Sequence, residues 1–321
     1  MGPLDVIALG EALVDFLPER PGARVRDVET WKKCLGGAPA NVVVGISRLG
    51  GRSAMCGVTG EDELGHFIAE ELAREGVDVS HLRHTVEGKT GIGFISLTAQ
   101  GERSFLFYRH QAAEFQLALR DVDHGFLASA KVLHLGTNSL LLPTAREASL
   151  SAARAAKDRG QIVSCDPNLR LHLWKDPAQL RALLDQLLGL CTVVKLSDEE
   201  IEFVTGEQDP AHALAALRAR GVALPIVTLG ERGAVLRVGE TIVEVPAPKV
   251  QVVDTTGAGD GFMAGLLFRL TRVAATRAQL EAIGAGQLEP MARFACRVGA
   301  SVVTKLGAVA GLPRMSQLEP Q

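Results

Sequence analysis

Apolar positions along the chain follow two alternating patterns. Short runs rich in β-branched residues are followed by longer stretches in which apolar residues recur at helical spacing. The short runs predict strands at Val6–Leu9, Val132–Leu135, Ile162–Cys165, Val193–Leu196 and Ile226–Leu229. The longer stretches predict helices at Ala40–Leu49, Gly65–Glu75, Thr144–Arg159, Leu180–Leu188, Asp198–Val204 and Ala211–Arg220. This alternation predicts right-handed βαβ units around a mostly parallel, buried sheet.

Two parts of the chain break this alternation. Gly91–Leu97 and Ser104–Tyr108 are short apolar runs separated by the polar turn residues Gln100 and Gly101, and this pattern predicts a hairpin. The segment Asp15–Cys34 is extended, charged and interrupted by proline, so it fits no helix. We interpret these segments together as a small β-structured lid over the main domain. Decoration of a sheet edge is the alternative.

Length and charge limit the classes of protein to which the chain can belong. Its 321 residues suffice for one large α/β domain or for two smaller ones. The net charge is −3, Lys and Arg form no run, and aromatic residues make up only 4% of the chain. Neither a basic nucleic-acid surface nor a stacking platform for single strands is therefore expected.

The cysteines and the N-terminal residues predict a cytoplasmic protein. The five cysteines are scattered and form no CxxC pair, which argues against a zinc ribbon or a thioredoxin-type site and favours reduced thiols. The first residues lack the basic start and long apolar run of a signal peptide. No window reaches the roughly 18 apolar residues of a membrane helix, so no membrane partner is expected.

The strongest local signal is the glycine-rich segment Asp254–Asp260 (DTTGAGD), which precedes apolar residues at helical spacing. Small residues in a turn that opens a helix leave main-chain N–H groups uncovered at the positive end of the helix dipole. Such groups suit an anion, for example a transferring phosphoryl group. The carboxylate of Asp260 in the first turn suits the removal of a proton from a hydroxyl. A helix-capping aspartate is the alternative.

Two better-known phosphate-binding motifs are excluded. The P-loop pattern GxxxxGK[ST] occurs nowhere in the chain. The segment is not a dinucleotide fingerprint either, because Phe262 stands where GxGxxG needs a glycine. A Rossmann oxidoreductase would share the α/β alternation, but this missing fingerprint argues against it.

Two motifs together resemble the signatures of the ribokinase-like (PfkB-type) sugar kinases. Residues 254–260 resemble the C-terminal signature of that family, and Gly36–Asn41 (GGAPAN) resembles the N-terminal one. The likeness extends from Gly10 to about Pro313. It implies a single domain over residues 1–321 with a three-layer α/β/α fold and a mostly parallel central sheet. It also implies that a small β-sheet lid is formed by about residues 12–35 and 90–112.

Within this family the chain is most similar to fructokinases. Asp166–Arg170 (DPNLR), followed by Leu173 and Trp174, resembles a stretch of fructokinases and 2-keto-3-deoxygluconate kinases. Lys195–Glu200 (KLSDEE) is also similar to fructokinases, although Ser197 stands where the family's NxxE motif has asparagine. The resemblance implies an ATP-dependent kinase that converts fructose to fructose 6-phosphate. A 2-keto-3-deoxygluconate kinase, a ribokinase or a nucleoside kinase is the alternative, and a catalytically inactive sugar-binding regulator is an alternative of a different class.

The resemblance assigns roles to residues of the reaction and of the sugar site. Asp260 is the general base, and the main-chain N–H groups of Gly257, Ala258 and Gly259 stabilise the transferring phosphoryl group. Hydroxyl-binding side chains, and glycines that let the sugar approach the backbone, are assigned at Asp15, Gly36, Gly37, Asn41, Tyr108, Arg109, Asn168 and Arg170. A cation at Arg109 could also bind the carboxylate of an acid sugar. Turn glycines, a helix-capping Asn41, a solvated Arg109 and an ion-paired Arg170 are the structural alternatives.

The resemblance also implies cofactors and a partner. The nucleotide is assigned to Lys195, Thr228, Gly230 and Gly233, of which the last three lie in a turn (TLGERG) that resembles the family's nucleotide-binding turn. Glu200 is assigned to the water shell of Mg²⁺, with an exposed helix carboxylate as the alternative. Asp254 and Thr256 are assigned to a monovalent cation such as K⁺. The expected ligands are thus ATP, cations and a small sugar, and the exposed face of the lid suggests a homodimer.

Overall fold

The computed structural model describes residues 3–19, 22–97 and 103–318. A nine-stranded sheet has the order β13-β12-β11-β10-β9-β8-β1-β4-β5. Its strands are β1 (Leu4–Leu9), β4 (Ser53–Gly60), β5 (Asp78–Thr85), β8 (Ala130–Leu135), β9 (Ile162–Cys165), β10 (Val193–Ser197), β11 (Leu224–Thr228), β12 (Ala234–Val238) and β13 (Thr241–Val245). All neighbours from β5 to β11 are parallel, and β12 and β13 continue the sheet as antiparallel strands. The mostly parallel sheet is confirmed.

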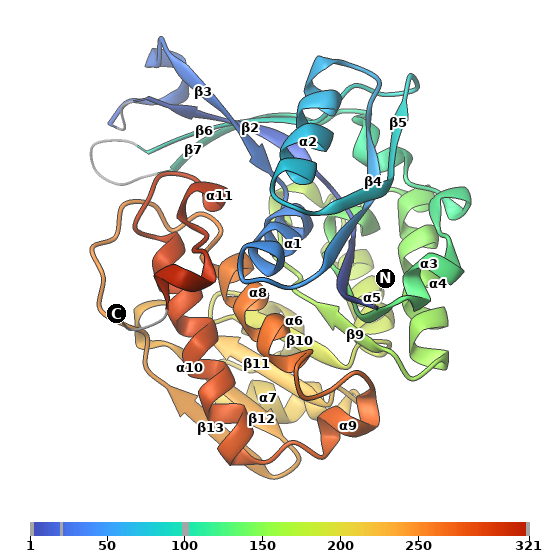
Figure 1. Cartoon of the computed structure of the whole chain (residues 1–321), viewed down its shortest axis with the longest axis vertical. Helices are drawn as coiled ribbons and strands as arrows, with labels where there is room; N and C mark the ends of the chain where they lie inside the picture. Colours follow the sequence, from blue (N-terminus) through green and yellow to red (C-terminus); the bar gives the residue numbers. More distant parts are fainter. Residues whose placement is uncertain (1–2, 20–21, 98–102, 319–321) are drawn as a thin grey trace.

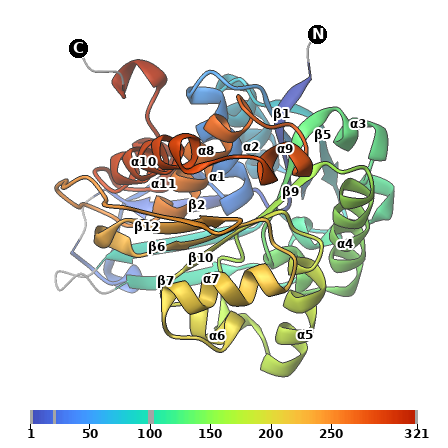
Figure 2. The same ribbon diagram turned by 90° about the horizontal axis from the view of Figure 1, so that it is seen from below.

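Helices cover both faces of this sheet (Figures 1 and 2). One layer contains α1 (Ala38–Arg48), α2 (Glu63–Arg74), α8 (Ala258–Leu270), α9 (Arg277–Glu281) and α10 (Ala285–Val302). The other contains α3 (His124–Ala128), α4 (Pro143–Asp158), α5 (Pro177–Leu188), α6 (Ile201–Thr205) and α7 (Pro210–Ala219), and the short α11 (Ala308–Gly311) follows α10. None of the described helices combines the length and the apolar character needed to cross a bilayer.

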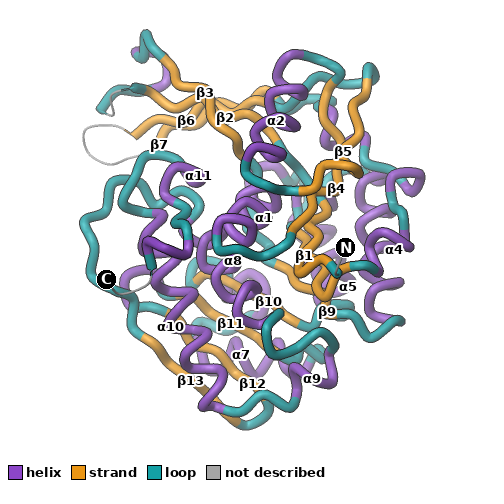
Figure 3. The backbone as a smooth tube through the Cα atoms, in the orientation of Figure 1, coloured by secondary structure: helices purple, strands orange, loops and turns teal. Residues whose placement is uncertain are grey.

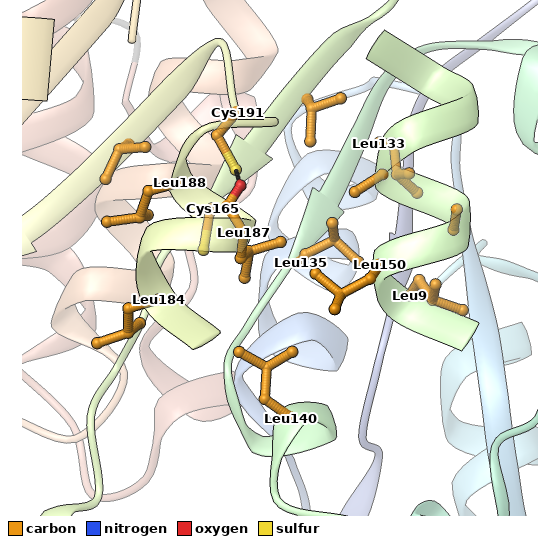
Figure 4. Packing of buried hydrophobic residues seen from close by; sticks show 14 of the residues in the cluster. Leu9, Leu133, Leu135, Leu140, Leu150, Cys165, Leu184, Leu187, Leu188 and Cys191 are labelled. Carbon is orange, nitrogen blue, oxygen red and sulfur yellow. Dashed lines mark hydrogen bonds between the residues drawn. The ribbon is translucent and has the colours of Figure 1, made fainter. Parts of the chain in front are cut away.

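The core is divided by the sheet because successive strand residues point to opposite faces. Leu133 and Leu135 of β8 pack with the leucines of α5 and the alanines of α4, as Figure 4 shows for part of this cluster. Val132 of the same strand faces the other way, into the cluster formed by α1, α8 and α10. Two apolar faces on every central strand require two helical layers, which gives the predicted three-layer α/β/α fold.

A second, four-stranded sheet has the order β3-β2-β6-β7 and lies at the upper left of Figures 1 and 3, above α11. We call it the small sheet; its strands are β2 (Leu13–Pro18), β3 (Trp31–Gly36), β6 (Ile92–Leu97) and β7 (Arg103–Tyr108). The predicted hairpin is confirmed, because β6 and β7 pair antiparallel from Ile92 opposite Tyr108 to Leu97 opposite Arg103. The turn predicted at Gln100 and Gly101 lies outside the described residues. β2 joins β3 antiparallel and β6 parallel.

The structure differs from the sequence pattern in a few elements. The helix expected at Asp198–Val204 begins only at Ile201, because residues 198–200 form a turn in which the carboxylate of Glu200 accepts a bond from Ser197 N. The strand β4 was not predicted, since it is buried along its whole length and rich in small residues, without alternation. The β12–β13 hairpin was not predicted either, although its two β-branched runs meet at Gly239 and Glu240.

Candidate active site

The glycine-rich turn opens α8. Gly257 caps the helix with a φ of 79°, a left-handed conformation that glycine adopts without strain. A Cβ at this position would lie 2.3 Å from the Cβ of Ala308, so space and conformation both require glycine. The N–H groups of the next residues stand at a helix N-terminus, where the dipole favours negative charge. The predicted turn that opens a helix is confirmed, and anion binding there stays a prediction.

Asp260 lies in the first turn of α8 and is buried, with 7% of its surface exposed. Its Oδ2 accepts a 2.7 Å hydrogen bond from Nδ2 of Asn41, a buried residue of the neighbouring helix α1. Burial raises the pKa of Asp260 to about 7, against the opposing effect of the Asn41 hydrogen bond. A carboxylate with this pKa can take up a proton at neutral pH, as a general base must.

A second carboxylate, Asp15 of β2, lies near Asp260. Burial raises the pKa of Asp15 to about 7, the positive charge of Arg109 opposes this rise, and the negative charge of Asp260 adds to it. A Cβ at Gly36 would lie 2.2 Å from Asp15 Oδ2, and one at Gly93 would lie 2.7 Å from Oδ1. Glycines on both neighbouring strands thus leave room around this carboxylate. Gly37 is equally confined, since a Cβ added there would lie 2.6 Å from the main-chain oxygen of Glu11.

Arg109 follows β7 and is nearly buried. Its Nε donates a 2.8 Å hydrogen bond to Oε1 of Glu114, whose side chain is 1% exposed. Nearby, Oε1 of Glu11 accepts a 2.8 Å bond from Nδ2 of Asn138. Four buried polar atoms in this region have no hydrogen-bond partner among the described residues, namely Glu11 Oε2, Asn41 Oδ1, Arg109 Nη2 and Glu114 Oε2. Buried polar groups without partners are costly, so their grouping indicates a place for a polar ligand.

Glu11, Glu114 and Asn138 were not identified from the sequence. Glu11 comes directly after Gly10 at the carboxyl end of β1, where open α/β sheets bind ligands, and this position was a usable signal. Glu114 lies in a short 3-10 helix, Ala113–Gln116, and no local pattern distinguishes it from a surface residue. Only the fold brings its carboxylate to Arg109.

The structure does not bring Tyr108 together with Asp15. Paired strand residues share a face, and Asp15 pairs with Gly93, which pairs with Phe107. Tyr108 therefore belongs to the opposite face, and 62% of it is exposed there. Its ring lies edge-on to that of Phe94, with centroids 6.1 Å apart.

The segment after β9 contributes a cation. Asn168 has a φ of 45° and is half-buried, and Arg170 is exposed. Nη1 of Arg170 donates to the main-chain oxygens of Asn168 and Leu169, at 3.4 and 3.2 Å. The positive charge of Arg170 lowers the pKa of both Asp15 and Asp260, so this residue acts on both candidate carboxylates.

Lys195 of β10 lies beneath the glycine-rich turn. Its Nζ donates to Oδ1 and Oδ2 of Asp166, at 3.0 and 2.9 Å, and both side chains are buried. Burial opposes the charged form of Lys195, but Asp166 and Glu200 outweigh it, so the pKa of Lys195 is raised and the amine stays charged. A Cβ at Gly259 would lie 2.8 Å from Lys195 Nζ. Lys195, which the resemblance assigned to the nucleotide, is thus next to the turn, although it is paired with Asp166.

The remaining predicted residues lie at the carboxyl ends of β10 and β11 and in the loop before α8. Thr228 ends β11 opposite Ser197, and Gly230 and Gly233 flank the turn that follows. Glu200 is held by main-chain N–H groups, at 2.6 Å from Leu169 N and 2.8 Å from Ser197 N. Asp254 accepts bonds through Oδ1 from the N–H and hydroxyl of Thr256, at 2.9 and 2.7 Å, and through Oδ2 from Gly307 N at 3.0 Å.

Nearly the whole chain matches one family of enzymes. A sequence profile of the pfkB family of carbohydrate kinases matches residues 4–315. The chain belongs to the pfkB family of carbohydrate kinases. This family membership accounts for the two motifs at 36–41 and 254–260, which the fold brings together through Asn41 and Asp260.

Relatives of this pfkB kinase include plant fructokinases and bacterial sugar kinases. It is 37% identical over 314 residues to fructokinase-2 of Solanum lycopersicum, covering 97% of this chain and 94% of that protein. The crystal structure of a Xylella fastidiosa fructokinase with bound ATP matches with a TM-score of 0.88 and 32% identity, covering 98% of this chain and 96% of that one. A Vibrio cholerae fructokinase double mutant with fructose, ADP and potassium ion bound matches with a TM-score of 0.86 and 34% identity, covering 99% and 98%.

Proposed function

We propose that this pfkB kinase is an ATP-dependent fructokinase that transfers the γ-phosphate of ATP to the 6-hydroxyl of fructose. The observation that carries the proposal is the position of Asp260, a buried carboxylate with a pKa of about 7 in the first turn of α8. The relatives reported above support the choice of sugar and nucleotide, because two of them are fructokinases with ATP or with fructose and ADP bound.

In the proposed mechanism Asp260 Oδ1 faces the sugar hydroxyl while Oδ2 is held by Asn41. As the hydroxyl oxygen attacks the γ-phosphorus, its proton passes to Asp260, and the bond to the β-phosphate oxygen breaks. Negative charge that spreads over the phosphoryl oxygens is stabilised by the N–H groups of Gly257, Ala258 and Gly259. These main-chain donors are fixed by the helix start, so they need no reorganisation during the reaction.

The sugar is proposed to lie between α1 and the small sheet, against Asp15, Gly36, Gly37 and Asn41. The unpartnered Oδ1 of Asn41 supports this position, because a buried amide oxygen without a donor can accept a hydrogen bond from a sugar hydroxyl. Arg109, Asn168 and Arg170 are proposed to bind on the other side of the sugar. The ATP phosphates are proposed to lie over the turn next to Lys195, and the rest of the nucleotide along Thr228, Gly230 and Gly233.

Cations are proposed at two places. No group of three or more His, Cys, Asp or Glu side chains suited to a metal occurs in the described part of the chain, so Mg²⁺ would take most ligands from phosphate oxygens and water. Glu200 fits the water shell, since main-chain donors fix its carboxylate. Asp254 and Thr256 are proposed to hold K⁺ through carboxylate, hydroxyl and main-chain oxygens. Comparison of the rate in K⁺ with that in a bulky organic cation tests this second site.

We also propose a homodimer formed through the small sheet. The face opposite Asp15 carries an aromatic cluster, in which the ring centroid of Phe94 lies 5.0 Å from the ring centroids of both Phe16 and Trp31. Leu106 and Tyr108 extend the same face and are 43% and 62% exposed. Sedimentation velocity should give a dimer for the parent protein and a monomer for Leu106→Glu; a monomeric parent protein would refute the proposal.

We propose a cytoplasmic location because the cysteine thiols are unpaired. All five cysteines are free in the structure, and four of them are buried. Unpaired thiols persist in a reducing compartment. Measurement of the thiol content of the protein purified from its own cells tests this, since paired cysteines would contradict it.

A panel of substrates in a coupled ADP-release assay tests the proposed function. The panel contains fructose, 2-keto-3-deoxygluconate, ribose and adenosine, each with ATP. We expect the highest kcat/KM with fructose. Higher kcat/KM with any of the other three would replace fructokinase by that activity, and no turnover of any of them would favour a non-catalytic sugar-binding protein.

A further inference from the structure

One ion pair in the candidate sugar site, between Arg109 and Glu114, takes no part in the proposed phosphoryl transfer. Arg109 comes two residues after Phe107, and alternation along the strand puts both on the face of the small sheet that carries Asp15. The Arg109 and Glu114 side chains are 10% and 1% exposed, and a 2.8 Å bond joins them. The pair is therefore desolvated and lies on the wall next to Asp15.

The surroundings leave space for the Glu114 carboxylate. A Cβ at Gly91 would lie 2.4 Å from Glu114 Oε1 and 2.8 Å from Oε2. Gly91 is held in the sheet, since its main-chain oxygen accepts a 3.0 Å bond from Val14 N. A larger residue at position 91 would push the carboxylate away from Arg109, so the pair depends on this glycine.

Arg109 and Glu114 each have a buried polar atom that makes no hydrogen bond with the described residues. Nη2 of Arg109 and Oε2 of Glu114 are both buried and have no hydrogen-bond partner among the described residues. An unsatisfied buried polar group costs about 1–3 kcal/mol, and more when it is charged. One of these atoms can only donate and the other can only accept. A hydroxyl group satisfies both at once, because it accepts from Arg109 and donates to Glu114.

A carboxylate cannot satisfy both atoms. It would accept from Arg109 Nη2, but it would meet the like charge of Glu114 and has no proton to donate. Glu11 adds to this effect, because its Oε2 is a further buried, unpartnered acceptor in the same region. The carboxylates of Asp15, Glu11 and Glu114 thus outnumber the two arginines of this site, Arg109 and Arg170.

We propose that Glu114 sets this kinase for neutral sugars: it neutralises Arg109, forms with it a donor–acceptor pair that binds a sugar hydroxyl, and rejects sugar acids. This inference rests on the proposed sugar-kinase function and names the residue that selects its substrate class. Arg109 is paired with Glu114 and is therefore not free to bind a substrate carboxylate. This pairing favours a ketose kinase over a keto-acid kinase.

The test compares kcat/KM for fructose with kcat/KM for 2-keto-3-deoxygluconate. Glu114→Gln keeps the shape of the side chain and removes its charge, so Arg109 becomes available to a carboxylate. We expect the ratio to shift at least tenfold toward the acid, with a higher KM for fructose. The double variant Arg109→Gln/Glu114→Gln removes the cation as well and should show a smaller shift toward the acid than Glu114→Gln.

Two further variants separate selectivity from folding. Gly91→Ala leaves all charges in place and displaces the Glu114 carboxylate, so it should shift the ratio in the same direction even if Glu114→Gln folds poorly. Asp5→Asn is the matched control. Asp5 is a buried, ion-paired carboxylate at the amino end of β1, the end of the strand opposite to that of the candidate site. It should leave the ratio unchanged.

The outcomes separate the inference from the function on which it rests. A parent protein that phosphorylates fructose, together with Glu114→Gln and Gly91→Ala ratios within twofold of the parent's, would overturn the role of Glu114. A parent protein that prefers the keto-acid would overturn the proposed fructokinase activity and this inference together. Isothermal titration of gluconate, as an acid probe, into the parent protein and Glu114→Gln gives the same comparison without turnover, and equal affinities would also overturn the inference.

Discussion

The side-chain amide of Asn41 donates a 2.7 Å hydrogen bond to the carboxylate of Asp260, across 219 residues of sequence. Each partner comes from one of the two family motifs, and α1 and α8 lie side by side at the centre of the molecule (Figure 1). The bond fixes one oxygen of the candidate base and leaves the other for a substrate. It thus couples α1, the helix proposed to bind the sugar, to α8, the helix that opens with the glycine-rich turn.

Replacement of Asp260 is the first test of this arrangement. Asp260→Asn keeps an oxygen that can accept the bond from Asn41 but removes the basic site. We expect kcat to fall by at least about 100-fold, while the affinities for sugar and ATP stay within a few-fold, because general bases contribute on this scale. Asp121→Asn, which changes a buried carboxylate paired with Arg83, is the control. A kcat within threefold of the parent's would remove Asp260 from the mechanism.

The pH dependence of kcat/KM tests the electrostatic role of Asn41. Its hydrogen bond lowers the pKa of Asp260, which burial nevertheless raises to about 7. Because only the ionised carboxylate can accept the proton, activity should fall as the pH falls through about 7. Asn41→Ala removes the stabilising donor, so the pKa of Asp260 should rise and the acid limb of the profile should move to higher pH. An acid limb that moves to lower pH would contradict this relationship.

The parts of the site that the sequence predicted are local or belong to motifs. The turn at Gly257 and the position of Asp260 in a first helical turn follow from small residues placed before an apolar, helix-spaced segment. Asn41 was predicted as a sugar residue, but its bond to Asp260 depends on how two distant helices pack. Such a contact cannot be obtained from the spacing within either motif.

The faces on which Tyr108 and Arg109 lie depend on strand register, which could not be predicted from the sequence. Tyr108 and Arg109 are neighbours in sequence, yet Tyr108 lies on the exposed face and Arg109 on the face of Asp15. Which face is which depends on the pairing of β2 with β6, strands that are distant in sequence, and a shift by one residue would exchange the two. Glu114 lies five residues beyond Arg109 in a short 3-10 helix, so its bond to Arg109 depends on how the chain turns back after β7 and could not be recognised before the fold was known.

The buried pair between Lys195 and Asp166 predicts a large effect on stability. Lys195→Met leaves the Asp166 carboxylate buried without its partner, and breaking such a pair costs about 3–5 kcal/mol. Urea unfolding should show this loss, and Lys195→Met/Asp166→Leu should recover part of it. Lys157→Met is the control, because Lys157 donates to the main-chain oxygen of Gly189 at an exposed position, so its replacement breaks no buried ion pair among the described residues. A loss below about 1 kcal/mol for Lys195→Met would show that the pair is dispensable.

A methyl group at position 36 should damage sugar binding selectively. The Cβ of Gly36→Ala would lie 2.2 Å from Asp15 Oδ2 and 2.9 Å from a methyl group of Leu13, so the carboxylate must move. Since one misplaced methyl-sized group changes recognition by roughly 10–200-fold, we expect KM for fructose to rise at least tenfold while KM for ATP stays unchanged. Gly286→Ala is the matched control, because apart from its own helix no described residue comes within 4 Å of the added Cβ.

If Gly36→Ala left KM for fructose unchanged while Asp15→Ala raised it, Asp15 would bind the sugar in a position that tolerates the shift. If neither substitution changed it, the sugar would lie away from Asp15, and the site between α1 and the small sheet would be wrong.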